Sequence, residues 1–121
     1  PEATGGREPL LAKGKTVARA LAVMQEHIET PLSITEVARR AGRSQKDLEA
    51  RMKAELGAPP RAVYRRLRLI QARKLVLETD QSVGEIALRC GYEDPSALTR
   101  AFRAEFQTTP RALRSAGREP P

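Results

Sequence analysis

Two segments of the 121-residue chain carry polar side chains that helical spacing places on one face. In each segment an apolar residue recurs at every fourth position, and this pattern predicts one buried edge. The buried edges consist of Leu48, Met52 and Leu56 in the first segment and Leu98, Phe102 and Phe106 in the second. The outward faces consist of Gln45, Lys46, Glu49, Ala50 and Lys53 in the first, and Ser96, Ala97, Thr99, Arg100 and Arg103 in the second. In the major groove of DNA, arginine suits guanine, glutamate accepts from the cytosine amine, and alanine or threonine methyls contact thymine. These faces are therefore suited to non-covalent base reading.

An internal repeat precedes both faces. The chain reads SITEVARRAG at 33–42 and SVGEIALRCG at 82–91, with the same Ser, Glu, Ala, Arg and Gly in the same order. A serine followed three residues later by a glutamate predicts a capping box at the start of each helix. A small residue four positions before the final glycine allows a second helix to cross closely, which is typical of a helix-turn-helix. Any capped pair of bundled helices would also fit one copy, but two copies on a basic chain favour two helix-turn-helix units.

The remaining pattern predicts an all-α fold. A first helix is expected from Val17 through Ile28, ended by Pro31 because proline disfavours a helical residue before it. Further helix starts are expected at Ser33, Ser44, Pro60, Ser82, Asp94-Pro95 and Thr109-Pro110, and stops at Gly42, Gly57 and Gly91. The predicted organisation is a linker or disordered segment at 1–14, helix-turn-helix subdomains at 15–58 and 80–116, a linker helix at 59–79, and a tail at 117–121. A linker helix of about 18 residues spans roughly 27 Å, which suits recognition helices in successive major grooves.

Charge and composition narrow the class of partner. Lys and Arg number 22 against 15 Asp and Glu, giving a net charge of +7 and favouring a polyanion, although a solubilising surface charge is an alternative. One cysteine, Cys90, allows neither a disulfide framework nor a cysteine-based zinc site within the chain. No segment approaches the ~20 apolar residues that a membrane helix needs, so we expect a soluble, cytoplasmic protein. Because the chain begins with Pro1, we expect it to be a fragment or a processed product.

Nothing in the sequence predicts an enzyme, a cofactor or a metal site. The only histidine, His27, and the only cysteine lie on separate predicted helices, and no glycine-rich phosphate loop is present. We expect His27 near the end of the first helix to face solvent or to interact with the helix dipole. Cys90 matches the small residue Ala41 in the repeat, which indicates a packing role rather than a redox role.

The chain resembles the DNA-binding domain of the AraC/XylS family of bacterial transcription regulators from about Val17 to Arg114. The most specific stretch is RLRLIQARKLVLETDQSVGEIALRCGYEDPSALTRAFRAEF at 66–106. The resemblance implies seven helices in two subdomains, promoter binding, recruitment of RNA polymerase as an activator, and a separate N-terminal sensing domain. The linker helix looks most similar to the GlxA-type branch, whose sensing domain resembles a glutamine amidotransferase.

The resemblance also places the base-reading positions, which agree with the outward faces. They fall on Lys46, Glu49, Ala50, Ser96, Thr99 and Arg100. We expect contacts to the DNA backbone from Gln45, Lys53, Arg61, Arg65, Arg103 and Arg111, and Arg66 is similarly placed. A solvated face is an equal alternative for the arginine-rich run at 61–69.

Several residues depart from the family pattern. Ala50 and Met52 stand where Arg and Phe are common, and Glu49 brings a negative charge to the first face. Base reading by the first unit is therefore in doubt. Gln107 replaces a usual glycine and Leu113 a usual tyrosine, so we expect a looser C-terminal cap. The alternative function is a basic helical module that contacts RNA polymerase and binds DNA mainly non-specifically.

Overall fold

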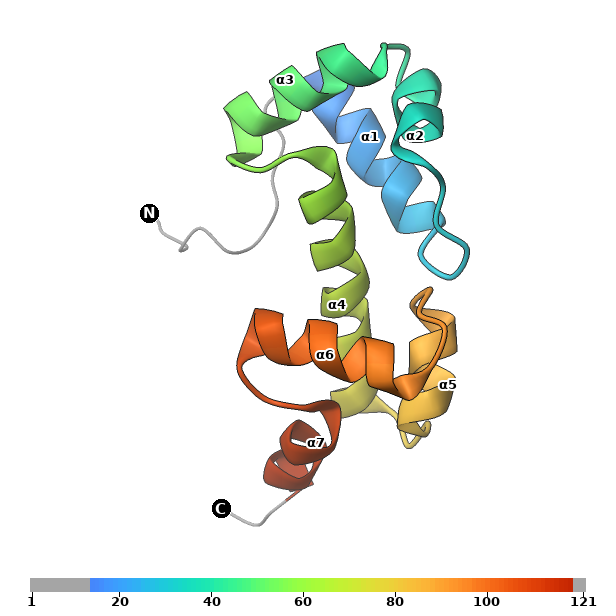
Figure 1. Ribbon diagram of the computed structural model, residues 1–121, viewed down its shortest axis with the longest axis vertical. Coiled ribbons are helices and arrows are strands. Elements are labelled where there is room, and N and C mark those ends of the chain that lie inside the picture. The colour runs from blue at the N-terminus through green and yellow to red at the C-terminus, as the bar shows by residue number, and fades with distance from the viewer. Residues whose placement is uncertain (1–13, 119–121) are drawn as a thin grey trace. The chain divides into compact units, whose positions relative to one another are not determined.

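The structure is a computed structural model that describes residues 14–118. Its helices are α1 (Lys15–Glu26), α2 (Ile34–Arg40), α3 (Gln45–Leu56), α4 (Pro60–Glu78), α5 (Val83–Arg89), α6 (Pro95–Phe106) and α7 (Pro110–Arg118). Across the described residues these seven helices are the only regular elements (Figure 1), which confirms the predicted all-α class. The segment predicted as a linker lies outside the described residues except for Gly14, and so does the predicted tail beyond Arg118.

The chain divides into two compact units. Among the described residues, the first unit holds 14–27 and 32–64, and the second holds 28–31 and 65–118. Each unit contains one helix-turn-helix, α2–α3 in the first and α5–α6 in the second. The long helix α4 contributes its first residues, up to Tyr64, to the first unit and its remainder, from Arg65, to the second.

Side-chain caps begin the helices as the repeat predicts. Backbone N–H groups donate to the side chains of Ser33, Ser44, Ser82, Asp94 and Thr109. The capping box is complete at Ser82, whose own N–H donates to the Glu85 carboxylate at 2.9 Å. At Ser33 the second half of the predicted box is wrong, because the Glu36 carboxylate instead pairs with Arg39 and Arg40, each at 2.6 Å. Hydrogen bonds from Arg39 and then Arg40 lower the pKa of Glu36 to about 2.

The end of α1 corrects the prediction that this helix runs through Ile28. The helix stops at Glu26, because His27 leaves the helical conformation and its backbone N–H turns back to Met24 O at 3.1 Å. The His27 ring also donates from Nδ1 to Val23 O at 2.9 Å, so it satisfies a terminal carbonyl. Tyr64 Oη donates to His27 O at 2.5 Å and accepts from Leu32 N at 3.0 Å. Ile28 is therefore not on the α1 stripe and packs against the core of the second unit.

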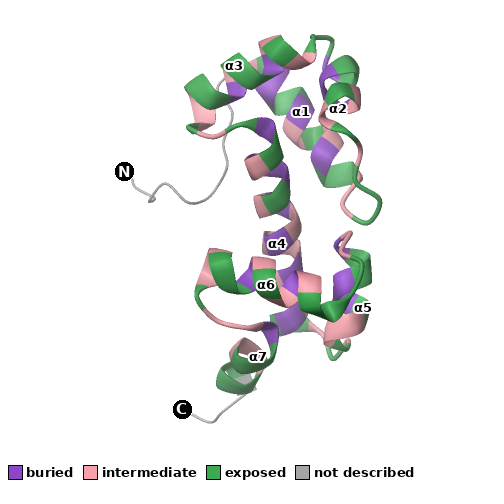
Figure 2. Ribbon diagram, in the orientation of Figure 1, coloured by how far each residue is buried: buried purple, intermediate pink, exposed green. Residues whose placement is uncertain are grey.

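In the first unit, α1, α2 and α3 pack against one another. Figure 2 shows the buried residues as purple bands on these helices. The side chains with no exposed surface are Val17, Ala20, Met24, Val37, Ala38, Leu48 and Met52. Leu56, predicted on the buried edge of α3, is only half-buried because it lies in the last turn of the helix.

The core of the second unit has the same plan. It is formed by Leu69, Ala72, Val76, Ile86, Ala87, Cys90, Leu98 and Phe102. Cys90 is fully buried, and burial raises the pKa of its thiol to about 11, in agreement with the predicted packing role. Phe106 is half-buried rather than buried, and its ring packs edge-on against Phe102 with centroids 4.8 Å apart.

Helix α7 is held to the end of α4 by one arginine. Arg114 donates to Val76 O at 3.1 Å, Thr79 O at 3.1 Å and Gln81 O at 2.6 Å. The bond to Val76 O satisfies a carbonyl that the end of α4 leaves without a partner, and the other two hold the segment that follows the helix. Leu113 packs against the core of this unit.

The two helix-turn-helix turns need glycine for partly different reasons. Gly42 and Gly91 have φ values of 81° and 82°, in the left-handed region. A Cβ on Gly42 would meet no heavy atom within 4 Å. A Cβ on Gly91 would lie 2.8 Å from Ile28 O and 2.8 Å from a Pro31 side-chain carbon. Gly91 is therefore required both by its backbone angle and by a close neighbour.

These two glycines form a matched test of the close approach. Gly42→Ala should cost about 1 to 2 kcal/mol of unfolding free energy, because only the left-handed conformation is strained. Gly91→Ala should cost about 1 to 3 kcal/mol more, because the neighbouring chain must shift. Urea unfolding at equilibrium measures both values, and equal costs would contradict the steric explanation.

A second matched pair lies at the ends of α3 and α6. Gln107 has a φ of 58° where the repeat counterpart, Gly57, has 77°. Gln107→Gly should raise the unfolding free energy by about 1 kcal/mol, and Gly57→Gln should lower it by a similar amount. Thermal unfolding checks both, and a destabilised Gln107→Gly variant would show that the Gln107 bond to Ala104 O outweighs the strain.

Candidate nucleic-acid interface

The outward face of α3 is exposed, and its one carboxylate has a polar partner on the same helix. Lys46, Glu49 and Ala50 are all exposed, opposite the fully buried Leu48 and Met52. Gln45 is half-buried; its amide donates from Nε2 to Glu49 Oε2 at 3.0 Å, and its Oε1 accepts from Thr35 Oγ1 at 2.5 Å. The Glu49 carboxylate thus already accepts a hydrogen bond within its own helix.

Acidic and basic residues are equal in number along α3. The basic residues are Lys46, Arg51 and Lys53, and the acidic residues are Asp47, Glu49 and Glu55. Asp47 pairs with Arg51 at 2.7 Å and with Arg43 at 3.6 Å. This helix therefore offers a polyanion little net attraction.

The outward face of α6 differs in charge. Ser96, Arg100 and Arg103 are exposed, and Thr99 is half-exposed, opposite the buried Leu98 and Phe102. Within residues 14–118, the guanidinium groups of Arg100 and Arg103 have no hydrogen-bond or ion-pair partner. The helix therefore presents two cations that no carboxylate of the described part of the chain neutralises.

The basic residues of α4 divide into two groups. Arg61, Arg65 and Lys74 are exposed, as the predicted phosphate contacts of Arg61 and Arg65 require. Arg66, Arg68 and Arg73 are half-buried and contact parts of the second unit.

Each half-buried arginine has its own contact. Arg66 pairs with Glu105 at 3.5 Å, so the structure gives it an intramolecular contact instead of the free position expected for phosphate binding. Arg73 lies over the Phe106 ring at 4.5 Å, and Arg68 reaches the turn between α5 and α6. Sequence reasoning missed Arg68 and Arg73, because spacing alone does not distinguish an arginine that packs on a neighbouring helix from a solvated one.

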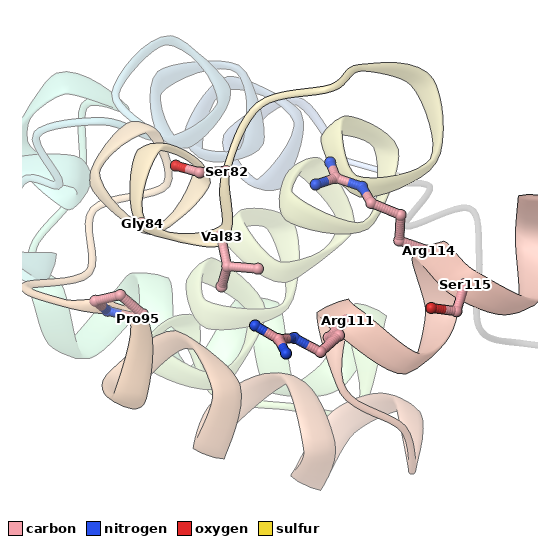
Figure 3. Close-up of a pocket in the computed structure, with 7 residues that line it drawn as sticks. All are labelled: Ser82, Val83, Gly84, Pro95, Arg111, Arg114 and Ser115. Carbon is pink, nitrogen blue, oxygen red and sulfur yellow. The ribbon is translucent and has the colours of Figure 1, made fainter.

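A surface hollow lies where α5, α6 and α7 meet in the second unit (Figure 3). Its lining residues are Ser82, Val83, Gly84, Pro95, Arg111, Arg114 and Ser115. Figure 3 shows the Arg111 guanidinium pointing toward Val83, whereas Arg114 turns toward the end of α4 that it caps. Arg111 is exposed, so its cation is available beside the first residues of both α5 and α6.

Metal sites and membrane-spanning helices are both absent from the described part of the chain. In the part of the chain that the structure describes, no three His, Cys, Asp or Glu residues gather in a way that could hold a metal ion. No helix between residues 14 and 118 is long and apolar enough to cross a bilayer.

The amino-acid sequence of the chain is similar to those of known transcription regulators. Residues 37–116 match a family model described as a helix-turn-helix domain. The chain is 35% identical over 96 residues to the HTH-type transcriptional regulator CdhR of Pseudomonas aeruginosa, covering 79% of this chain and 29% of that protein. It is also 35% identical over 94 residues to the HTH-type transcriptional activator RhaS of Klebsiella pneumoniae, covering 78% of this chain and 34% of that protein. The match thus covers about a third of the length of these curated relatives.

Solved structures agree with the sequence matches. A transcriptional regulator with an AraC-type DNA-binding domain from Chromobacterium violaceum superposes with a TM-score of 0.83 at 34% identity, over 88% of this chain and 95% of that one. The DNA-binding domain of the global transcriptional factor AdpA, solved with a target DNA, gives a TM-score of 0.80 at 31% identity, over 87% and 95%. Together with the repeated helix-turn-helix, these matches show that the chain belongs to the family of AraC-type helix-turn-helix DNA-binding domains.

Proposed function

We propose that this domain binds double-stranded DNA sequence-specifically within a bacterial transcription regulator, with α3 and α6 entering successive major grooves. The observation that carries the proposal is the outward face of α6. Arg100 and Arg103 are exposed there, without partners among the described residues, on a helix whose opposite stripe is fully buried. A rigid helix with free guanidinium groups suits readout of guanine in a major groove.

The two recognition helices should contribute unequally. On α6, Ser96, Thr99 and Arg100 read bases. On α3 the corresponding positions are Lys46, Glu49 and Ala50, and Glu49 is the only carboxylate among these six positions. A carboxylate can accept from a cytosine amine but repels phosphates, so α3 adds discrimination at the expense of general affinity.

Contacts to the backbone come from residues around these faces. They are Gln45, Lys53, Arg61, Arg65, Arg103 and Arg111. The backbone contact proposed for Arg111 is supported by the exposure of this residue in the hollow beside the start of α6, where a phosphate flanking the groove can reach it. Gln45 has the weakest support of the six, because its amide already bonds Glu49 and Thr35.

The wider assignment follows from the relatives. CdhR is named a transcriptional regulator and RhaS a transcriptional activator. By analogy we propose that the full protein is a cytoplasmic activator that contacts RNA polymerase and carries a separate sensing domain. That this sensing domain is of the GlxA type stays a prediction. The subdomain boundaries 15–58, 59–79 and 80–116 belong to the same proposal.

A direct test uses the 121-residue chain and duplexes selected from a random pool. At physiological salt, the selected duplex should bind at least about 10³-fold more tightly than a scrambled duplex of equal length. Affinities within about tenfold of each other would leave only non-specific binding and overturn the proposal.

Arg100 and Arg61 separate base reading from phosphate binding. Arg100→Ala should cost about 1 to 3 kcal/mol on the selected duplex and relax discrimination at one base position. Arg61→Ala should weaken all duplexes alike and reduce the salt slope by about one. Fluorescence anisotropy over a salt series measures both, and an equal loss for Arg100→Ala on selected and scrambled DNA would exclude its base-reading role.

The charge balance of α3 favours one alternative function. A helix with no net charge suits contact with a protein such as RNA polymerase rather than DNA, and the domain would then bind DNA mainly non-specifically. Glu49 decides between these roles, because its carboxylate is exposed on the outward face and hydrogen-bonded to Gln45.

Glu49→Gln removes this charge and keeps the shape of the side chain. If α3 enters the groove, affinity for scrambled DNA should rise several-fold and the preference at one base pair should weaken. Asp47→Asn is a matched control on the same helix, since its carboxylate already pairs with Arg51. Unchanged DNA binding by Glu49→Gln would place α3 outside the groove and support the protein-contact role.

A further inference from the structure

The turn of the second helix-turn-helix is held by one side chain from α4. Arg68 donates from Nε to Cys90 O at 2.8 Å and from Nη2 to Gly91 O at 2.7 Å. The same guanidinium lies over the Tyr92 ring, 4.3 Å from its centroid. The planar guanidinium group of Arg68 therefore contacts three consecutive residues of the turn. The ammonium group of a lysine could not make the same set of contacts.

Among the described residues of the first unit no arginine makes such a contact, although the core of this unit is built in the same way. Val17, Ala20 and Met24 of α1 have the spacing and the burial of Leu69, Ala72 and Val76 of α4. The residue before each set is Thr16 in the first unit and Arg68 in the second.

Glu55 and Glu105 extend this correspondence. Glu55 accepts from Gly14 N at 3.0 Å, and Glu105 pairs with Arg66, two residues before Arg68. Gly14 likewise lies two residues before Thr16, so the two glutamates contact equivalent positions in the two units.

The backbone bonds of the two turns are the same. Arg43 N donates to Ala38 O at 3.0 Å in the first turn, and Tyr92 N donates to Ala87 O at 2.8 Å in the second. The arginine contact is thus an addition to a turn that the backbone already closes.

Helix α4 also contacts the far end of α6. Arg66 pairs with Glu105, and Arg73 lies over Phe106 in the last turn of the helix. Helix α6 is therefore anchored to α4 both at the turn that precedes it and at its C-terminal end.

We propose that Arg68 is a positioning residue for base reading, which fixes the turn and so the direction in which α6 presents its outward face. The inference rests on the proposed function. Two of the Arg68 donors are used by the turn and its plane is stacked on Tyr92, so its effect on DNA is transmitted through α6. Base contacts depend strongly on direction, because a bidentate pair is lost when a helix shifts by a fraction of a hydrogen-bond length.

The test compares sequence preference at the two half-sites. Wild type and Arg68→Gln are each selected against random duplex DNA, and the preference at every base position is measured. Arg68→Gln should lower discrimination about 5- to 100-fold per base pair in the half-site read by α6. Discrimination in the half-site read by α3, affinity for scrambled DNA and the salt slope should stay the same.

Arg65→Gln is the matched control, since Arg65 is an exposed arginine on the same helix. It should weaken all duplexes and flatten the salt slope without changing either half-site preference. Tyr92→Phe keeps the ring face and removes a buried hydroxyl that has no hydrogen-bond partner among the described residues, so it should behave like wild type.

If circular dichroism shows that Arg68→Gln is unfolded, Arg68→Lys takes its place in the test. It keeps the charge but not the fork or the stacking, so it should fold and lose preference only in the α6 half-site. Equal losses in both half-sites, or an unchanged α6 half-site in a folded variant, would overturn the positioning role. If wild type itself shows no preference, the proposed function fails, which is a distinguishable result.

Discussion

A recognition helix can present a readable face only if its opposite stripe is buried, because a short helix in water is not stable by itself. Both α3 and α6 are 12 residues long, and each turns two large side chains completely into its core. Close packing then depends on Ala38 and Ala87, which have no exposed surface in the short helices that precede them. The charges, the turns and the arginine contacts all act on helices that this burial has already placed.

Local features of the structure were predictable from the sequence. Caps, glycine stops and the repeat depend on residues a few positions apart, so their spacing determines helix starts, turns and outward faces. The end of α1 was not predictable in this way, since His27 and Tyr64, far apart in the chain, satisfy its last carbonyls before Pro31 can act. The contacts of Arg68 and Arg73 with the turn and with α6 likewise depend on tertiary packing.

The two copies share a backbone plan and differ in electrostatics. Around the first turn, Glu36 is paired with two arginines and Glu49 with a glutamine, so polar groups satisfy one another. Around the second turn, Glu85 serves the backbone cap and Arg100 is left without a partner among the described residues. Duplicated scaffolds can therefore carry one strongly cationic surface and one balanced surface without any change of fold.

Tyr64 and Arg114 give α4 a role beyond that of a spacer. Each lies four residues after a buried proline, Pro60 or Pro110, and each reaches back to the end of the first helix of its own unit. The repeat is therefore a cycle of four helices in which the fourth closes on the first. Helix α4 therefore begins with the closing residues of one cycle and continues as the first helix of the next, so a single helix does the work of two.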